Sequence, residues 1–176
     1  MSNIQGKTIN FSLATLSDSE FIFSLRVNKK LNKYISTFSG KVEDQRKWLE
    51  DYKKRELKGK EFYYIISRND NGIPIGTVRL YDFIEKDNSF CWGSWIINEN
   101  KTPSSAIESA LLVYKIGFEH LKFSSSHFFV DKKNSLVIDF HKKSGAKIID
   151  EDDINIFFNY NPNIYHSLKE KYNRFL

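Results

Sequence analysis

Short apolar stretches separated by polar turns occupy the middle of the chain. Alternating β-branched and aromatic residues predict antiparallel strands over 61–67, 75–83 and 89–97. The sequence Arg68-Asn-Asp-Asn-Gly72 has the chemistry of a tight turn, so the first two of these strands pair as a hairpin or meander. Gly93, inside the third strand, predicts a β-bulge or a close backbone approach. An earlier strand is predicted over 7–12.

Apolar residues at three- and four-residue intervals predict a helix over 104–121 with one buried face. Thr102 and Pro103 have the residue types of an N-cap and a first helical position, so they predict where this helix begins. Two earlier helices are predicted, one from a cap at Ser17 or Asp18 to Leu31 and one over 43–57.

The last third of the chain predicts a short buried strand over 127–130 and then a helix over 134–144, which Asn134 caps and Gly145 ends. Two more strands and a final helix follow, over 146–149, 154–158 and 162–176. No Pro-, Gly- or Ser-rich linker interrupts this order, so we expect a single domain over residues 1–176. The mixture of meander and crossover segments predicts an α/β fold, a mixed central sheet of about six to seven strands flanked by helices.

The composition is that of a folded protein. Of 176 residues, 40% are hydrophobic and 15% are aromatic, which excludes collagen-like and largely disordered classes. The single cysteine, Cys91, excludes an intramolecular disulfide and a multi-cysteine zinc site. Neither an export signal nor an apolar run of about 20 residues is present. We therefore expect a reducing cytoplasm, no membrane association and no metal.

The net charge of +5 is modest for a nucleic-acid-binding protein. Between residues 41 and 60, basic residues alternate with acidic ones at helical spacing, which is typical of a solvated helix face. Nucleic acid is therefore not the expected partner. A second basic group surrounds Asn134 and has the charge to face an anionic cofactor; it consists of Lys132, Lys133, Lys142 and Lys143.

The segment after the strand that ends at Ile97 is the first candidate site. Small residues open the next helix, at Thr102-Pro-Ser-Ser-Ala106. A helix N-terminus exposes unpaired backbone N–H groups at the positive end of its dipole, and small side chains let a phosphate approach them. An ordinary capped helix, with water on its N–H groups, is the alternative interpretation.

Two motifs resemble the GNAT superfamily of acyl-CoA N-acetyltransferases. The first, Lys101-x-x-Ser104-x-Ala106, is similar to the family's pyrophosphate loop, although Ser104 replaces a customary glycine. The second motif consists of Asn134, Phe140, His141, Lys143 and Gly145. Ala146 departs from the phenylalanine that usually follows. The order of predicted elements extends the resemblance over nearly the whole chain.

The resemblance implies that the fourth and fifth strands splay apart and hold acetyl-CoA as cosubstrate. The backbone near Trp95, Ile96 and Ile97 would then pair with the pantetheine, and Asn134 would hold the pantetheine arm. The implied diphosphate site lies between Lys101 and Ala106, and it includes Ser104 and Ser105. The implied reaction is direct attack of a neutral amine on the thioester, without an acetyl-enzyme.

That reaction needs a route for the amine proton and a donor for the departing thiolate. His141 occupies the position at which many relatives carry a tyrosine donor, and an imidazole with an unperturbed pKa of about 6.5 can cycle between its two forms near neutral pH. The candidate bases are Asp82, Glu85 and His127. A water chain is the alternative, because many such enzymes have no single base.

The implied acceptor site contains Arg26, Asn28, Tyr34, Trp92 and Ser94. Aromatic faces suit a sugar or nucleobase, and cationic and amide groups suit a diphosphate, so we expect a nucleotide-linked amino sugar as substrate, in surface polysaccharide biosynthesis. One alternative is acetylation of a protein N-terminus, as in the ribosomal-protein branch of the superfamily. Another is a non-catalytic acyl-CoA or RNA-binding module. Monomer and homodimer both remain open.

Overall fold

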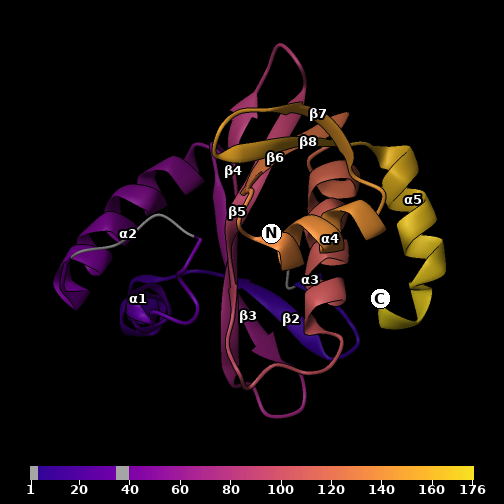
Figure 1. Cartoon of the computed structure of the whole chain (residues 1–176). Coiled ribbons are helices and arrows are strands. Elements are labelled where there is room, and N and C mark those ends of the chain that lie inside the picture. Colours follow the sequence, from indigo (N-terminus) through magenta and orange to yellow (C-terminus); the bar gives the residue numbers. More distant parts are fainter. Residues whose placement is uncertain (1–3, 35–39) are drawn as a thin grey trace.

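The computed structural model describes residues 4–34 and 40–176, and it contains a mixed eight-stranded sheet (Figure 1). The strand order is β1-β2-β3-β4-β5-β6-β8-β7, in which β5 and β6 are parallel and the other neighbours are antiparallel. The strands are β1 (Ile4–Gln5), β2 (Ile9–Leu13), β3 (Phe62–Arg68), β4 (Pro74–Ile84), β5 (Ser89–Ile97), β6 (Ser125–Asp131), β7 (Lys147–Glu151) and β8 (Asn155–Tyr160).

Helices cover both faces of the sheet. Figure 1 shows α1 (Ser19–Val27) and α2 (Val42–Leu57) on one face, and α3 (Ser105–Tyr114), α4 (Ser135–Lys143) and α5 (Pro162–Lys171) on the other. Strand β3 is a continuous apolar run because both of its faces are buried. Its Tyr63 and Ile65 pack in the core under α1 and α2, whereas the alternating Phe62, Tyr64 and Ile66 pack in the larger core on the other face.

The sheet splits between β5 and β6. The two strands pair only at Ser89 with Ser125 and at Phe90 with Ser126, and beyond these residues they separate. A bulge accompanies the separation, because Ser94 and Trp95 of β5 stand opposite the single residue Val78 of β4. The predicted fold class, with splayed fourth and fifth predicted strands, is confirmed; these strands are β5 and β6 because the two-residue β1 precedes them.

Several predicted boundaries are wrong. Helix α1 ends at Val27 rather than Leu31, since Asn28 is extended and its carbonyl accepts from the amides of Leu31 and Asn32 in a separate turn. Helix α3 does not begin at Thr102 and Pro103. Its N-cap is Ser104, because Thr102 and Pro103 belong to a turn closed by the Ser105 side chain.

The helix predicted over 104–121 also changes type along its length. Regular α-helix ends at Tyr114, and Lys115–His120 forms a π-helix, η2. Gly117 lies in this segment against the Phe90 ring, at a position where a Cβ would stand 2.2 Å from ring carbons. The final helix α5 ends at Lys171, and a short 3-10 helix, η3 (Asn173–Phe175), follows it. Among the described residues, no helix combines the length and apolar character needed to cross a bilayer.

Candidate active site

A cavity of about 330 Å³ lies where β5 and β6 separate, and we call it the splay cavity. Its walls come from β4, β5, β6, β8, α4 and the segment after α1. The residues that line it are Tyr34, Tyr81, Cys91, Trp92, Gly93, Ser94, Trp95, Phe128, Phe129, Val130, Asp131, Asn134, Val137, His141 and Asn155. Six of the site residues predicted from sequence are therefore brought together, namely Tyr34, Trp92, Ser94, Trp95, Asn134 and His141.

His141 projects from α4 into a shell of aromatic rings and is only 3% exposed. The rings within contact distance are those of Trp92, Trp95, Phe128, Phe140 and Phe158. Burial lowers the pKa of the imidazole from 6.5 to about 3, because the charged form loses its hydration there. The ring is therefore neutral at pH 7, and the expectation that it titrates near neutral pH is wrong. A neutral ring still offers one N–H donor and one acceptor.

The Nδ1 atom of His141 has no hydrogen-bond partner among the described residues. Buried polar atoms of this kind are rare, and they mark a missing water, ligand or functional constraint. The indole Nε1 of neighbouring Trp92 is unpartnered in the same way, whereas the indole of Trp95 donates to Ser109 Oγ at 3.0 Å. Trp92 lies between the rings of Tyr114, Trp95 and His141, so protein side chains already cover most of its surface.

Two strained residues flank the cavity. Ser94 in the β5 bulge has φ +48°, and Asp82 in a second bulge on β4 has φ +51°; both values are unfavourable for residues with a Cβ. The Ser94 carbonyl accepts from Thr77 Oγ1 at 2.9 Å, which fixes the bulge. Gly93 lies under the Tyr81 hydroxyl, where a Cβ would approach the phenolic oxygen to 3.0 Å. The predicted bulge is thus present directly after Gly93, and the group that closely approaches the Gly93 backbone is the Tyr81 side chain.

The predicted bases separate into a bonded pair and an isolated residue. His127 Nε2 lies 3.2 Å from Asp82 Oδ2, and His127 Nδ1 lies 2.8 Å from Ser89 Oγ. Neither Asp82 nor His127 lines the splay cavity, but each directly follows or precedes a residue that does. Glu85 instead is highly exposed and faces Lys60 at 3.6 Å. The structure therefore separates Glu85 from the other two candidates.

Two further residues line the splay cavity, the thiol Cys91 and the carboxylate Asp131. Cys91 is buried, and burial raises the pKa of its thiol to about 11, which agrees with an inert thiol. Asp131 is the one carboxylate among the lining residues of the splay cavity, and its Oδ1 accepts from the Lys133 amide at 2.8 Å. The sequence does not single out Asp131 as a site residue, because an aspartate after a predicted strand is also typical of a turn. Its spacing three residues before Asn134 is the available signal.

The predicted acceptor residues do not all reach the cavity. Tyr34 lines it, and Lys33 Nζ lies 5.0 Å from the Tyr34 ring centroid. Arg26 and Asn28 do not line it; the Asn28 side chain accepts from the Lys30 amide at 3.0 Å and so stabilises the turn after α1. Of the cations in segment 26–34, Lys33 is therefore the one that contacts a lining residue of the cavity.

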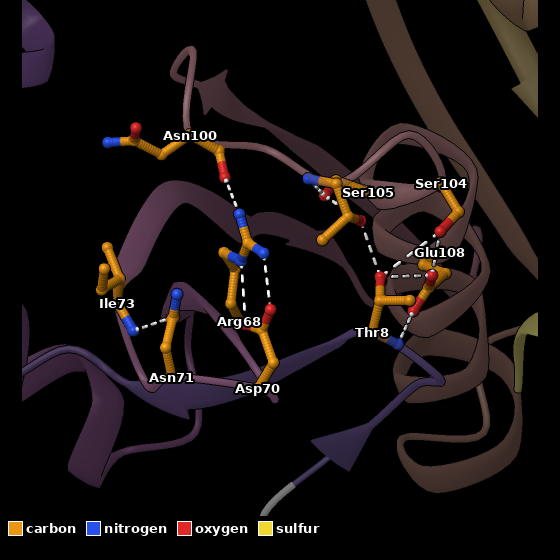
Figure 2. Close-up of polar contacts among 10 residues, drawn as sticks. Thr8, Arg68, Asp70, Asn71, Ile73, Asn100, Ser104, Ser105 and Glu108 are labelled. Atoms are coloured by element: carbon orange, nitrogen blue, oxygen red, sulfur yellow. Dashed lines mark hydrogen bonds and ion pairs between the residues drawn. The ribbon is translucent and has the colours of Figure 1, made fainter.

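The loop between β5 and α3 is tied to two other parts of the sheet (Figure 2). Arg68 donates to the Asn100 carbonyl at 3.1 Å while it pairs with Asp70. On the other side, the Thr8 hydroxyl lies 2.7 Å from that of Thr102. These contacts hold the loop in place from the last residue of β3 and from the residue before β2.

Beneath the loop lies Glu108, a fully buried carboxylate on α3. It accepts from the amide and hydroxyl of Thr8 at 2.8 and 2.7 Å, from the Ile9 amide at 3.3 Å and from Ser104 Oγ at 2.5 Å (Figure 2). Four donors thus replace the water that this carboxylate would otherwise bind. The Ser104 hydroxyl is turned inward as a result.

The Ser105 hydroxyl is also turned inward, 2.8 Å from that of Thr102, and it accepts from the Thr102 amide at 2.9 Å. The outer surface of the loop therefore presents backbone rather than serine hydroxyls. No acceptor in the described parts of the chain bonds the amides of Ala106 and Ile107, which are free for an anion at the helix N-terminus. Lys101 is exposed beside them.

Sheet pairing leaves a second set of free backbone groups. Ile96 and Ile97 pair with Thr77 and Gly76 of β4 on one edge only, and β6 has already separated from the other edge. The Ile96 side chain is buried, so the backbone is what this strand offers to a ligand. Asn134 uses its side-chain oxygen to accept from the Val137 amide at 3.4 Å, which leaves its side-chain N–H groups to donate. No group of three or more metal-ligating side chains occurs in the described ranges.

Comparison with known proteins identifies several relatives. Residues 9–147 match the family model of the acetyltransferase (GNAT) domain. The apo structure of FdhC, a nucleotide-linked sugar GNAT, is 51% identical, covers 99% of this chain and 98% of its own, and has a TM-score of 0.93. No curated protein matches.

Two more distant structures share the fold. Spermidine N-acetyltransferase from Vibrio cholerae, in complex with CoA and spermine, has 14% identity and a TM-score of 0.75, with 90% of this chain and 98% of that chain covered. Ribosomal-protein-S5-alanine acetyltransferase from Vibrio fischeri has 11% identity and a TM-score of 0.77, with coverages of 92% and 97%.

Proposed function

Because the chain belongs to the GNAT acetyltransferase family, we propose that it transfers an acetyl group from acetyl-CoA directly to the amine of a nucleotide-linked amino sugar. The observation that carries the acceptor assignment is the 51% identity, over essentially the whole length of both chains, to a nucleotide-linked sugar GNAT. The polysaccharide pathway and a reducing cytoplasm belong to the same proposal.

The residues present fit acetyl-CoA. The unpaired edge of β5 at Trp95–Ile97 and the Asn134 side chain offer hydrogen-bonding groups to an amide-containing arm. The free amides of Ala106 and Ile107, beside Lys101, suit a diphosphate. When bound, the cosubstrate supplies an acyl group activated as a thioester.

We assign to His141 the donation of a hydrogen bond to the leaving thiolate. Its imidazole is neutral, and it lines the cavity together with Trp92 and Trp95, so it offers an N–H group in a site from which rings exclude water. A donor fixed in such a site stabilises developing negative charge without reorganising at the moment of reaction. His141 thus acts as a hydrogen-bond donor and not as an imidazolium acid.

We assign to Asp82 and His127 the removal of the proton from the attacking amine. The Asp82 carboxylate and the His127 imidazole are 3.2 Å apart, so the two groups form one hydrogen-bonded route for a proton. Because neither residue lines the splay cavity, we assign the step to an intervening water. Asp82 is largely exposed, which gives the proton an exit to solvent.

The acceptor is assigned to the side of the splay cavity that Tyr34 and Tyr81 line. Their rings offer faces and hydroxyls to a sugar, and the cations of segment 26–34, with Arg26 and Asn28 among its residues, suit the diphosphate of a nucleotide. Ser94, at the bulge, adds a hydroxyl next to Trp92.

The test is a release assay for free thiol with acetyl-CoA and a panel of nucleotide-linked amino sugars, and with N-terminal peptides as the competing acceptors. We expect thiol release and an acetylated sugar nucleotide, identified by mass, at a kcat/KM at least about a hundredfold above that of any peptide. Preferential acetylation of a peptide would overturn the acceptor assignment and leave the family unchanged.

A further inference from the structure

The two tryptophans near His141 lie on the same face of β5, although they are three residues apart in the sequence. The Trp92 ring packs 5.7 Å from that of Tyr114 on α3, measured between centroids. Trp95 donates its indole N–H to Ser109 Oγ, also on α3, at 3.0 Å, and its ring lies 5.3 Å from that of Trp92. On a regular strand, residues an odd number of positions apart point to opposite faces of the sheet. The side-chain alternation of β5 is therefore shifted by one residue between Trp92 and Trp95.

The bulge in β5 produces this shift. Ser94 and Trp95 together stand opposite Val78, so one extra residue enters the strand and reverses the alternation beyond it. Without the extra residue, the Ser94 side chain would take the face on which His141 lies, and Trp95 would point toward α1 and α2. In the structure the Trp95 ring instead lies 6.4 Å from that of His141 and 5.2 Å from that of Phe140. The bulge is thus the reason that Trp95 belongs to the aromatic shell around His141.

A strained backbone conformation carries the bulge. Ser94 has φ +48°, in the left-handed region that residues with a Cβ rarely adopt. Such a conformation persists only where the surrounding structure holds it. The Thr77 hydroxyl donates to the Ser94 carbonyl at 2.9 Å, so it fixes the peptide group that joins Ser94 to Trp95.

Thr77 makes this contact from the opposite face of the sheet. It pairs with Ile65 of β3, whose side chain packs in the core under α1 and α2, and residues paired across antiparallel strands share a face. Thr77 is 1% exposed and is not among the residues that line the splay cavity. Loss of its hydroxyl would leave the Ser94 carbonyl without this donor at a position that water does not reach. An effect of Thr77 on the reaction therefore has to pass through β5.

We propose that Thr77 is a positioning residue for the transfer reaction, whose hydroxyl holds the β5 bulge in the form that keeps Trp95 on the face of His141. In that position Trp95 covers the imidazole and lines the splay cavity together with it. Displacement of Trp95 admits water to His141 and changes the shape of the cavity. The inference rests on the proposed function, because it takes His141 to be the donor to the departing thiolate.

Thr77→Val and Thr77→Ser form a matched pair for the test. Valine keeps the branched shape of threonine but lacks the hydroxyl, whereas serine keeps the hydroxyl and loses a methyl group. Thr77→Val should lower kcat by about tenfold to a hundredfold, because small displacements near the reacting groups act mainly on the transition state. Acetyl-CoA affinity, measured by calorimetry, should fall by no more than about threefold, since the free amides of the α3 loop are unchanged. Thr77→Ser should keep kcat within about threefold of the parent value.

The indole N–H signals report the position of Trp95 without any substrate. The chain has three tryptophans, so a proton–nitrogen correlation spectrum contains three indole signals, and that of Trp95 is the one lost in Trp95→Phe. In Thr77→Val the Trp95 signal should shift and its proton should exchange faster with solvent, because the bond to Ser109 Oγ is populated less. In Thr77→Ser the signal should stay at its parent position.

Ser94→Gly in the Thr77→Val background provides a rescue that is judged by the spectrum alone. Glycine adopts a positive φ without strain, so the bulge no longer needs the Thr77 hydroxyl and the Trp95 signal should return toward its parent position. Failure of this rescue would show that Thr77 acts elsewhere than at Ser94 and would overturn the proposal. Parent kcat and a parent Trp95 signal in Thr77→Val, or equal effects of valine and serine, would overturn it as well. Absence of acetyl transfer to every amine would instead count against the proposed function, because the indole spectra need no substrate.

Discussion

At the scale of single residues, the burial of His141 is the property that the local sequence predicts least well. It stands between Phe140 and Lys142 on an amphipathic helix, and nothing local distinguishes an exposed position from a buried one there. Five aromatic rings from β5, β6, α4 and β8 determine its burial. Those rings keep the imidazole neutral and leave it available as an N–H donor.

His141→Phe should lower kcat by about a hundredfold, the low end of what a positioned proton or hydrogen-bond donor contributes. Acetyl-CoA affinity should change by no more than about twofold, because the assigned contact forms only as the thiolate departs. Steady-state kinetics and calorimetry check the two parts separately. His141→Gln keeps an N–H donor and should retain more activity than the phenylalanine variant; equal kcat in the parent and in His141→Phe would remove this residue from the mechanism.

The same residue sets a pH dependence of stability. The pKa of His141 is about 3 in the folded protein, below its unfolded value of about 6.5, so the unfolded chain binds the extra proton between these values. This contribution to stability is complete above pH 6.5 and is lost as the pH falls, at up to about 1.4 kcal/mol per pH unit. Urea unfolding from pH 7 to pH 4 should therefore show a shallower loss for His141→Phe than for the parent protein, and parallel curves would contradict the buried neutral ring.

The three predicted bases can be ranked by substitution. Asp82→Asn and His127→Gln should each lower kcat by about tenfold to a hundredfold, and the double variant should be little worse, because the two groups act as one hydrogen-bonded unit. Glu85→Gln is the control and should stay within about twofold, since Glu85 is exposed and pairs with Lys60. Full additivity of the Asp82 and His127 effects would show that they act separately.

At the scale of elements, local pattern sufficed wherever a strand or helix is long. Strands β3 to β5 and helix α2 follow from alternation and spacing to within one or two residues. The two-residue β1 and the π-helix after Tyr114 are not encoded by a local repeat. The first depends on pairing with β2, and the second lies where Gly117 packs against Phe90, a contact between distant parts of the chain.

In the β5–α3 loop of the candidate site, side-chain orientation also depends on contacts with distant parts of the chain. Its composition predicted an anion site, but not that the hydroxyls of Ser104 and Ser105 turn inward to Glu108 and Thr102. A carboxylate introduced by Ser105→Glu would repel a diphosphate and, at this buried position, would also break the turn. We expect it to lower both the free energy of unfolding, by about 1–3 kcal/mol, and acetyl-CoA affinity.

Ser105→Ala separates the two effects, because it removes the turn contact without adding charge. It should cost about 1 kcal/mol of stability and weaken acetyl-CoA binding less than Ser105→Glu does. Chemical unfolding and calorimetry give both quantities. Unchanged stability in Ser105→Glu would mean that the loop rearranges freely and does not hold the amides of Ala106 and Ile107 in place.

At the scale of the whole molecule, the order of predicted elements was enough for the α/β class, because strands and helices that each bury one or two faces pack as layers. The splayed strands came only from the family resemblance. The order of elements does not predict which side chains meet in the splay cavity, because those contacts depend on strand pairing. Asp131 and Asn155 become neighbours through β6–β8 pairing, and Phe175 reaches Lys7 across nearly the entire chain length.

A buried ion-pair network connects the outer helical layer to the acceptor side of the cavity. Glu61, only 3% exposed, pairs with Arg55 of α2 and with Arg79 of β4. The Arg79 guanidinium lies 5.2 Å from the Trp48 ring and 4.6 Å from that of Tyr81, which lines the splay cavity. Removing the Glu61 carboxylate therefore leaves Arg55 and Arg79 without their shared ion-pair partner. Arg79 is then no longer held against the Tyr81 ring.

Glu61→Gln should lower the free energy of unfolding by about 3 kcal/mol, the usual cost of breaking a buried pair on one side. It should also raise the acceptor KM several-fold, while acetyl-CoA affinity stays within about twofold, because the network lies on the opposite face of the sheet from α3 and α4. Urea unfolding, steady-state kinetics and calorimetry measure the three quantities. If acetyl-CoA affinity fell together with acceptor affinity, the two faces of the sheet would form one coupled site, and a separate acceptor side would have to be abandoned.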